Sequence, residues 1–175
     1  MKKIISLSLL AAGLLLATYT QAQADKSKRP SPPARVTRTI SSGATVTIDY
    51  SQPSLKGRTI GVDVEPMEGK VWRMGANEAT IFETDKDVKI NGELLPAGKY
   101  SLFGIQQEDG FTLIFNKEWK IWGTQYEDNK EKDVLHVLAT LSNTDKIQEK
   151  LTYTIEKDGE VSLLWGNRKI EFKVQ

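Results

Sequence analysis

The sequence contains no cysteine and only one histidine among its 175 residues. Without a thiol, the chain can form no disulfide bond, no thiolate metal site and no lipid-modified cysteine. One histidine is also too few for a zinc site of the His/Cys type. The sequence has no glycine-rich phosphate loop followed by Lys-Ser or Lys-Thr, no strand–G-x-G-x-x-G–helix unit and no G-x-S-x-G nucleophile turn. We therefore expect no metal and no cofactor.

Neither sign of charge dominates the chain. It carries 24 basic and 23 acidic residues, a formal net charge of +1 at pH 7. The two signs are interspersed, so there is no electrostatic footprint of the kind that binds nucleic acid or an anionic membrane. We expect neither as a partner.

The one long apolar run is too short for an ordinary membrane span. It covers the fourteen residues Ile4–Ala17, whereas a span needs about 20. Two lysines precede it and Ala22-Gln23-Ala24 follows it, a pattern that predicts a signal peptide over residues 1–24. Cleavage after Ala22, or retention as a membrane anchor, are the alternatives. We expect a soluble mature protein without membrane insertion, in the periplasm or outside the cell.

The remainder divides into a linker and one domain. Residues 25–33 are polar and basic, and Pro30, Pro32 and Pro33 block regular structure, so we expect a flexible linker there. Residues 34–175 are numerous enough for a single domain with a substantial core and no disulfide.

Apolar and polar residues alternate through this domain with the period of two that is typical of strands. Val46, Ile48 and Tyr50, for example, are separated by Thr47 and Asp49. Asn91-Gly92 predicts a tight hairpin, because both residues accept positive φ. No window has the pattern of an amphipathic helix. The prediction is an all-β fold, an antiparallel β-sandwich, with a jelly-roll-like form or a partly closed barrel as the alternative.

The single histidine, His136, lies in the apolar run 134–140, which resembles a central strand buried on both faces. A lone histidine on an apolar face is usually a hydrogen-bonded core residue, which is our interpretation. A catalytic role or a surface position on an edge strand are the alternatives.

The segment Trp72–Thr80 interrupts the strand pattern, because its Gly, Asn and Glu residues pack poorly on a half-buried pleated surface. Three interpretations stay open, one as scaffold and two as a site. As scaffold, Trp72 fills the core, a turn follows, and Arg73 pairs with Glu78. As a ligand site, Arg73 binds a carboxylate or phosphate while Asn77 and Glu78 hydrogen-bond hydroxyls or amines.

The third interpretation makes Glu78 a catalytic acid or base. A second carboxylate would then face it, as in glycoside hydrolysis, with Asp49, Asp63 or Glu65 as candidates.

Two further segments offer residues to the same site. The short basic loop 53–58 ends in Arg58, and the connection 118–126 contains Trp122 and Tyr126. Aromatic side chains in such a connection stack on sugar rings or cover one end of the core. For the loop, a solvated turn is the alternative.

Several strings give the chain a resemblance to a family of exported bacterial proteins that is known only as a domain of unknown function. The strings are Tyr50–Arg58, Val71–Thr80 with the pattern Trp-Arg-x-Gly-Ala-Asn-Glu-Ala-Thr, Leu95–Phe103, and Trp122-Gly123 followed by Tyr126. They span nearly all of the mature domain. The resemblance implies a secreted or periplasmic β-rich domain of a Gram-negative bacterium, and it implies no activity.

The sequence thus favours an exported binding or accessory module over an enzyme. Its expected ligand is a small polar molecule or glycan, held by Arg58, Arg73, Asn77, Glu78, Trp122 and Tyr126. The alternatives are a metal-independent hydrolase that uses Glu78 with a second carboxylate, and a structural subunit of an envelope protein assembly, whose partner would be an envelope protein.

Overall fold

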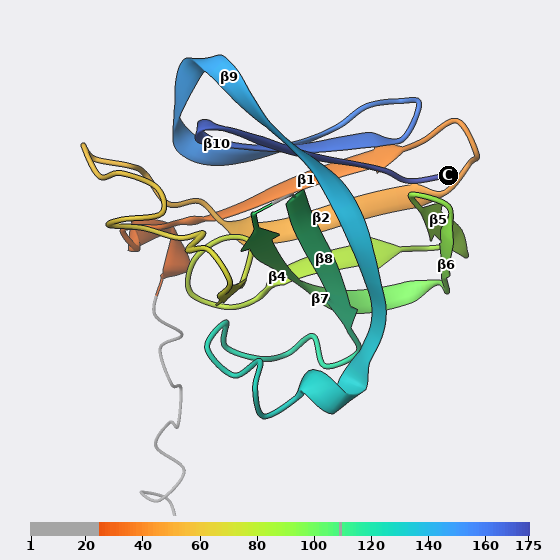
Figure 1. Ribbon diagram of the computed structural model, residues 1–175. Coiled ribbons are helices and arrows are strands. Elements are labelled where there is room, and N and C mark those ends of the chain that lie inside the picture. Colours follow the sequence, from red (N-terminus) through yellow and green to blue (C-terminus); the bar gives the residue numbers. More distant parts are fainter. Residues whose placement is uncertain (1–24, 109) are drawn as a thin grey trace, which may run out of the picture.

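Residues 25–108 and 110–175, the part of the chain that the computed structural model describes, form ten β-strands and two short 3-10 helices (Figure 1). The predicted signal peptide, residues 1–24, lies outside this part. In chain order the elements are η1 (Lys26–Lys28), β1 (Pro33–Thr39), β2 (Thr45–Ser51), β3 (Val71–Trp72), β4 (Thr80–Thr84), β5 (Val88–Ile90), β6 (Glu93–Leu95), β7 (Gly98–Gln107), β8 (Gly110–Asn116), η2 (Lys130–Lys132), β9 (Asp133–Ile155) and β10 (Glu160–Lys173).

Seven of the strands build one antiparallel sheet in the order β1-β2-β4-β7-β8-β9-β10, and β3 pairs with β7 beside this path. The sheet curls into a half-barrel, with the long strand β9 bending around one side (Figure 1). An all-β, antiparallel single domain is thereby confirmed. Among the forms that the sequence allowed, the curled sheet corresponds to the partly closed barrel.

The alternating pattern explains why the sheet has a buried inner face. In β2, the apolar residues Val46, Ile48 and Tyr50 are buried while the polar residues between them are partly exposed. Aromatic side chains from distant strands meet inside the curl, where the ring of Phe82 lies 5.3 Å from that of Phe115. Each large apolar side chain removed from water stabilises the fold by about 1.5–3 kcal/mol. This core supports the loops at the rim of the half-barrel.

The predicted Asn91-Gly92 hairpin is confirmed. It joins β5 to β6, and both turn residues have positive φ, 47° and 97°. The Asn91 side chain also donates to the carbonyl of Leu138 and accepts from the amide of Lys173. The turn residue therefore ties the small hairpin to β9 and β10.

The prediction that His136 lies in the core is wrong. Its side chain is 53% exposed, and Nε2 lies 2.9 Å from the Asp133 carboxylate. Val134 and Leu138, on the same face of β9, are exposed as well. Over these residues β9 pairs with β8 alone, because its pairing with β10 covers Thr140–Ile155, and the outer face of the curled sheet has no second layer over them. Apolar character on both faces therefore does not mean burial on both.

A second, smaller apolar cluster covers part of the outer face. Phe103 of β7 and Ile114 of β8 pack there with Ala79 and Tyr126. Leu113 and Ile114 belong to different clusters because neighbouring residues of a strand point to opposite faces. The connection 117–132, which carries Tyr126, thus closes over the outside of the sheet.

Candidate functional site

The loop from Arg73 to Ala79 is fastened to the sheet by buried polar groups. Trp72 is 2% exposed, and its Nε1 donates to the carbonyl of Gly75 at 3.1 Å. The carbonyl of Met74 accepts from the hydroxyls of Thr80 (3.1 Å) and Tyr153 (2.9 Å). A buried carbonyl without partners costs about 1–3 kcal/mol, so these bonds fix the path of the loop.

The backbone of this loop adopts unusual conformations. Met74 and Asn77 have positive φ, 55° and 60°, a region that residues other than glycine adopt at a cost. Between them, a Cβ at Gly75 would lie 2.9 Å from Thr80 Oγ1 and 3.2 Å from the carbonyl oxygen of Ser51. Glycine at this position lets the loop approach the sheet, and residues held in such conformations concentrate at functional sites.

The two polar segments that the sequence singled out lie against each other. Glu78 and Trp122 form an antiparallel bridge, and the amide of Gly123 donates to the carbonyl of Asn77 at 3.1 Å. Arg73 Nη1 donates to the same carbonyl at 3.2 Å. A Cβ at Gly123 would collide with the Arg73 side chain. Gly123, which follows Trp122, therefore leaves the space that the Arg73 side chain occupies.

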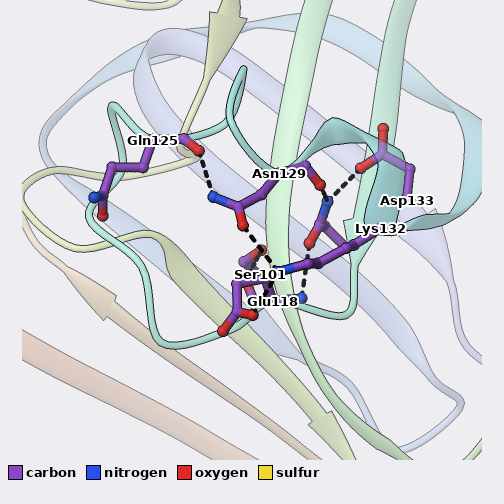
Figure 2. A network of polar contacts seen from close by, with 7 residues as sticks. Ser101, Glu118, Gln125, Asn129, Lys132 and Asp133 are labelled. Carbon is purple, nitrogen blue, oxygen red and sulfur yellow. Dashed lines mark hydrogen bonds and ion pairs between the residues drawn. The ribbon is translucent and has the colours of Figure 1, made fainter.

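A network of polar contacts orders the connection 117–132 (Figure 2). Asn116 is fully buried; its Nδ2 donates to the carbonyl of Asn129 and to Asp133 Oδ1, both at 2.7 Å. Its Oδ1 accepts from the amide of Glu118, and Asn129 in turn donates to the carbonyl of Gln125. Asn116 was not predicted as a site residue, because its only signal in the sequence is an amide at the end of an apolar strand.

Tyr126 is positioned by this network. Its ring packs 4.9 Å from that of Phe103, and its hydroxyl donates to Asp133 Oδ2 at 2.8 Å. Burial and the adjacent carboxylate of Asp133 raise the pKa of the Tyr126 hydroxyl well above its usual value. Tyr126 is thus fixed in position and uncharged.

The scaffold interpretation expected an ion pair between Arg73 and Glu78, but Glu78 does not pair with Arg73. It binds the segment before β1: Arg29 Nη1 lies 2.9 and 3.0 Å from its two oxygens, and Lys26 Nζ lies 3.0 Å from Oε1. Partial burial alone would raise the pKa of Glu78, but hydrogen bonds from Arg29 and Lys26 outweigh it and lower the pKa from 4.5 to about 2. Glu78 is therefore ionised and has no proton to donate as a general acid.

Asn77 and Trp122 contact the same segment. Asn77 Nδ2 donates to the carbonyl of Ser31 at 2.9 Å, and the guanidinium of Arg29 lies 6.0 Å from the Trp122 ring centroid. The predicted linker, residues 25–33, thus supplies the two cations that pair with Glu78, Lys26 and Arg29. Sequence reasoning missed both, although their charge opposite to Glu78 is a weak signal.

The three candidate second carboxylates have different surroundings. Asp49 lines a cavity of about 160 Å³ together with Glu78, but it is ion-paired with Arg35. Asp63 accepts from the amide of Thr59. Glu65 lines a different cleft. Glu78 and Asp49 are each ion-paired with an arginine, whereas glycoside hydrolysis needs a protonated acid.

Two clefts meet at Arg73. The larger has a volume of about 470 Å³, and its polar lining comes from Glu65, Lys70, Arg73, Thr124, Tyr126 and Glu127. The smaller, of about 230 Å³, is lined by Arg58, Arg73, Glu65, Ser31 and Trp165 among others. The structure thus brings Arg73 together with Tyr126 on one side and with Arg58 on the other.

Arg58 is held by its own loop. Its Nε and Nη2 donate to the carbonyls of Leu55 (2.9 Å) and Ser54 (2.7 Å). The six predicted ligand residues therefore divide into two groups. Arg58, Arg73 and Tyr126 line the clefts, and Asn77, Glu78 and Trp122 contact residues 26–31.

Within residues 25–108 and 110–175, no three His, Asp or Glu side chains are grouped so as to hold a metal ion. No helix in this part of the chain is long and apolar enough to cross a membrane.

Comparison with known proteins gives one match. Residues 31–174 match the family described as "Protein of unknown function (DUF2911)". No curated protein and no solved structure matches the chain. The family match covers most of the chain and all of the strings that carried the resemblance, which is thereby confirmed. The chain belongs to DUF2911, a family of unknown function.

Proposed function

We propose that this domain is an exported binding module whose ligand is a small, hydroxylated molecule with an acidic group, such as an acidic sugar. The ligand would occupy the larger cleft at Arg73. One observation carries the proposal: among the described residues, no carboxylate lies within 4.0 Å of the Arg73 guanidinium, although this side chain is partly buried.

Burying the positive charge of Arg73 without an ionic partner has a free-energy cost. An arginine stays protonated at any physiological pH and presents five N–H donors in a planar fork. The bond to the Asn77 carbonyl uses one of them. A carboxylate or phosphate can accept two of the others side by side, and such a bidentate contact is among the strongest in proteins. The rigid loop holds the guanidinium in place before a ligand arrives, which lowers the entropic cost of binding.

The size and lining of the cleft fit a small molecule. A volume of about 470 Å³ lies within the range of roughly 300–1,000 Å³ of small-molecule sites. Around Arg73, the cleft offers acceptors on Glu65 and Glu127, and donors on Lys70 and Thr124. Mixed donors and acceptors around one cation suit several hydroxyl groups and one acidic group. An ionised, doubly paired Glu78 argues against the hydrolase.

The test is thermal unfolding of the wild type, Arg73→Met and Arg35→Met with a panel of neutral sugars, acidic sugars and organic acids. Arg35→Met is the matched control, because Arg35 is exposed and pairs only with Asp49 at the surface. We expect an acidic member at about 100 times its Kd to raise the wild-type and control midpoints by about 5–10 °C, and to leave Arg73→Met unshifted. An equal shift in all three proteins, or no shift with any acidic member, would overturn the proposal.

A further inference from the structure

We propose that Asn77, Glu78 and Trp122 form a second binding site, distinct from the larger cleft at Arg73, whose ligand is a basic peptide segment with a lysine and an arginine three residues apart. In this structure the site is occupied by residues 26–31 of the same chain.

The contacts come from three kinds of group on the receptor side. The Glu78 carboxylate accepts from Arg29 and Lys26, with distances of 2.9–3.0 Å. The Asn77 amide donates to a backbone carbonyl, that of Ser31, at 2.9 Å. The Trp122 ring lies under the Arg29 guanidinium at 6.0 Å, which is at the outer limit of a cation–π contact. The receptor residues thus contact the charge, the backbone and the guanidinium face of the bound segment.

The geometry of the segment explains the three-residue spacing. Residues Lys26–Lys28 form one turn of 3-10 helix, in which side chains at i and i+3 lie on the same side. Lys26 and Arg29 therefore face Glu78 together. Asp25 stabilises the turn by accepting from the amide and hydroxyl of Ser27, at 3.0 and 2.7 Å.

Lys28 serves as an internal comparison. It lies on the same turn, but its side chain is 83% exposed and its nearest carboxylate is Asp25, at 3.9 Å. If the site recognised positive charge alone, any lysine of the segment would serve. The contacts instead select two positions out of three.

The receptor side is rigid, which distinguishes it from a chance surface ion pair. Glu78 is held by its bridge to Trp122, and Asn77 by the amide of Gly123 and by a left-handed backbone. The occupant is held by polar contacts at a partly exposed surface, where single ion pairs are weak. A segment held in this way can exchange for a basic segment with the same spacing on a partner protein.

The experiment measures binding of a labelled peptide by fluorescence anisotropy. The peptide has the sequence of residues 25–33, Asp-Lys-Ser-Lys-Arg-Pro-Ser-Pro-Pro. The receptor is the full chain with Lys26→Ala and Arg29→Ala, which weakens its own occupant. A tethered segment that stays docked implies a free-peptide Kd below the effective concentration of about 1 mM. We therefore expect saturable binding by about 5 mM, and binding two- to tenfold weaker to the wild type, whose own segment competes.

Specificity is tested on both partners. Glu78→Gln in the double variant should weaken binding at least about fivefold. A peptide with alanine in place of Lys26 and Arg29 should bind equally poorly, whereas a peptide with Lys28→Ala should bind like the original. The peptide variants leave the receptor unchanged, so the test stands even if Glu78→Gln folds poorly. Absence of binding at about 5 mM, or equal loss with the Lys28→Ala peptide, would overturn the proposal. Neither outcome bears on the cleft at Arg73.

Discussion

Arg73 and Glu78 are five residues apart in one loop and carry opposite charges, yet they have opposite surroundings. Glu78 is bound by two cations of the segment before β1, and Arg73 contacts a backbone carbonyl at the junction of two clefts. The positive φ values of Met74 and Asn77 turn the chain between them. The Arg73 guanidinium uses one of its five N–H donors in the bond to Asn77, whereas both carboxylate oxygens of Glu78 are bound by cations. Opposite charges that are close in sequence therefore need not pair when the backbone directs them to different faces.

The largest effect on stability should come from Trp72, the buried residue that supports both the Arg73 side and the Glu78 side of the loop. Trp72→Ala removes a nearly fully buried indole and its bond to Gly75. We expect the free energy of unfolding to fall by about 3–5 kcal/mol, with loss of both the cleft and the contact with residues 26–31. Urea unfolding, with Trp119→Ala as a control at a partly exposed tryptophan of the connection 117–132, measures the change. A loss below about 1 kcal/mol would show that Trp72 does not support the loop.

An intermediate effect should separate the two sides. Gly123→Ala places a methyl group where the Arg73 side chain passes, so we expect a loss of about 1–3 kcal/mol and a displaced guanidinium. Binding of the acidic ligand proposed above should be lost, while the contact of Glu78 with Arg29 should persist. A structure of the variant and ligand titrations measure both. Unchanged ligand affinity would mean that the position of Arg73 does not depend on Gly123.

The smallest effect should be confined to the Glu78 side and should depend on pH. Because the pKa of folded Glu78 lies near 2, below its usual 4.5, the stabilisation is present above pH 4.5 and is lost as the pH falls towards 2. The carboxylate is about a third exposed, so solvent screening limits the contribution to about 1 kcal/mol. Thermal unfolding between pH 6 and pH 2 should bring the wild type and Glu78→Gln together at the acid end. A constant difference between them would exclude this ion pair as the cause.

The sequence predicted much of the fold, since the period-two pattern and the Asn91-Gly92 turn depend only on local chemistry. It did not predict which face of β9 is exposed, because a run that is apolar on both faces does not say what covers each face. His136 was misplaced for this reason.

For the site, the sequence identified the correct segments and paired the wrong residues. Trp122-Gly123 does meet the Trp72–Thr80 loop. The proline-rich composition of residues 25–33 predicted a flexible linker. It carried no information about ionic contacts, so Lys26 and Arg29 were missed as the partners of Glu78.

Asn77 has a consequence for how the two sides communicate. Its carbonyl accepts from Arg73, and its side-chain amide donates to Ser31, so one residue contacts both proposed binding sites. If an acidic ligand at Arg73 shifts this residue and changes the affinity for the basic segment, thermodynamic reciprocity requires the segment to change the affinity for the ligand by the same factor. Asn77→Gly would keep the left-handed backbone and cut the side-chain half of this link, so it would measure the coupling free energy between the two sites.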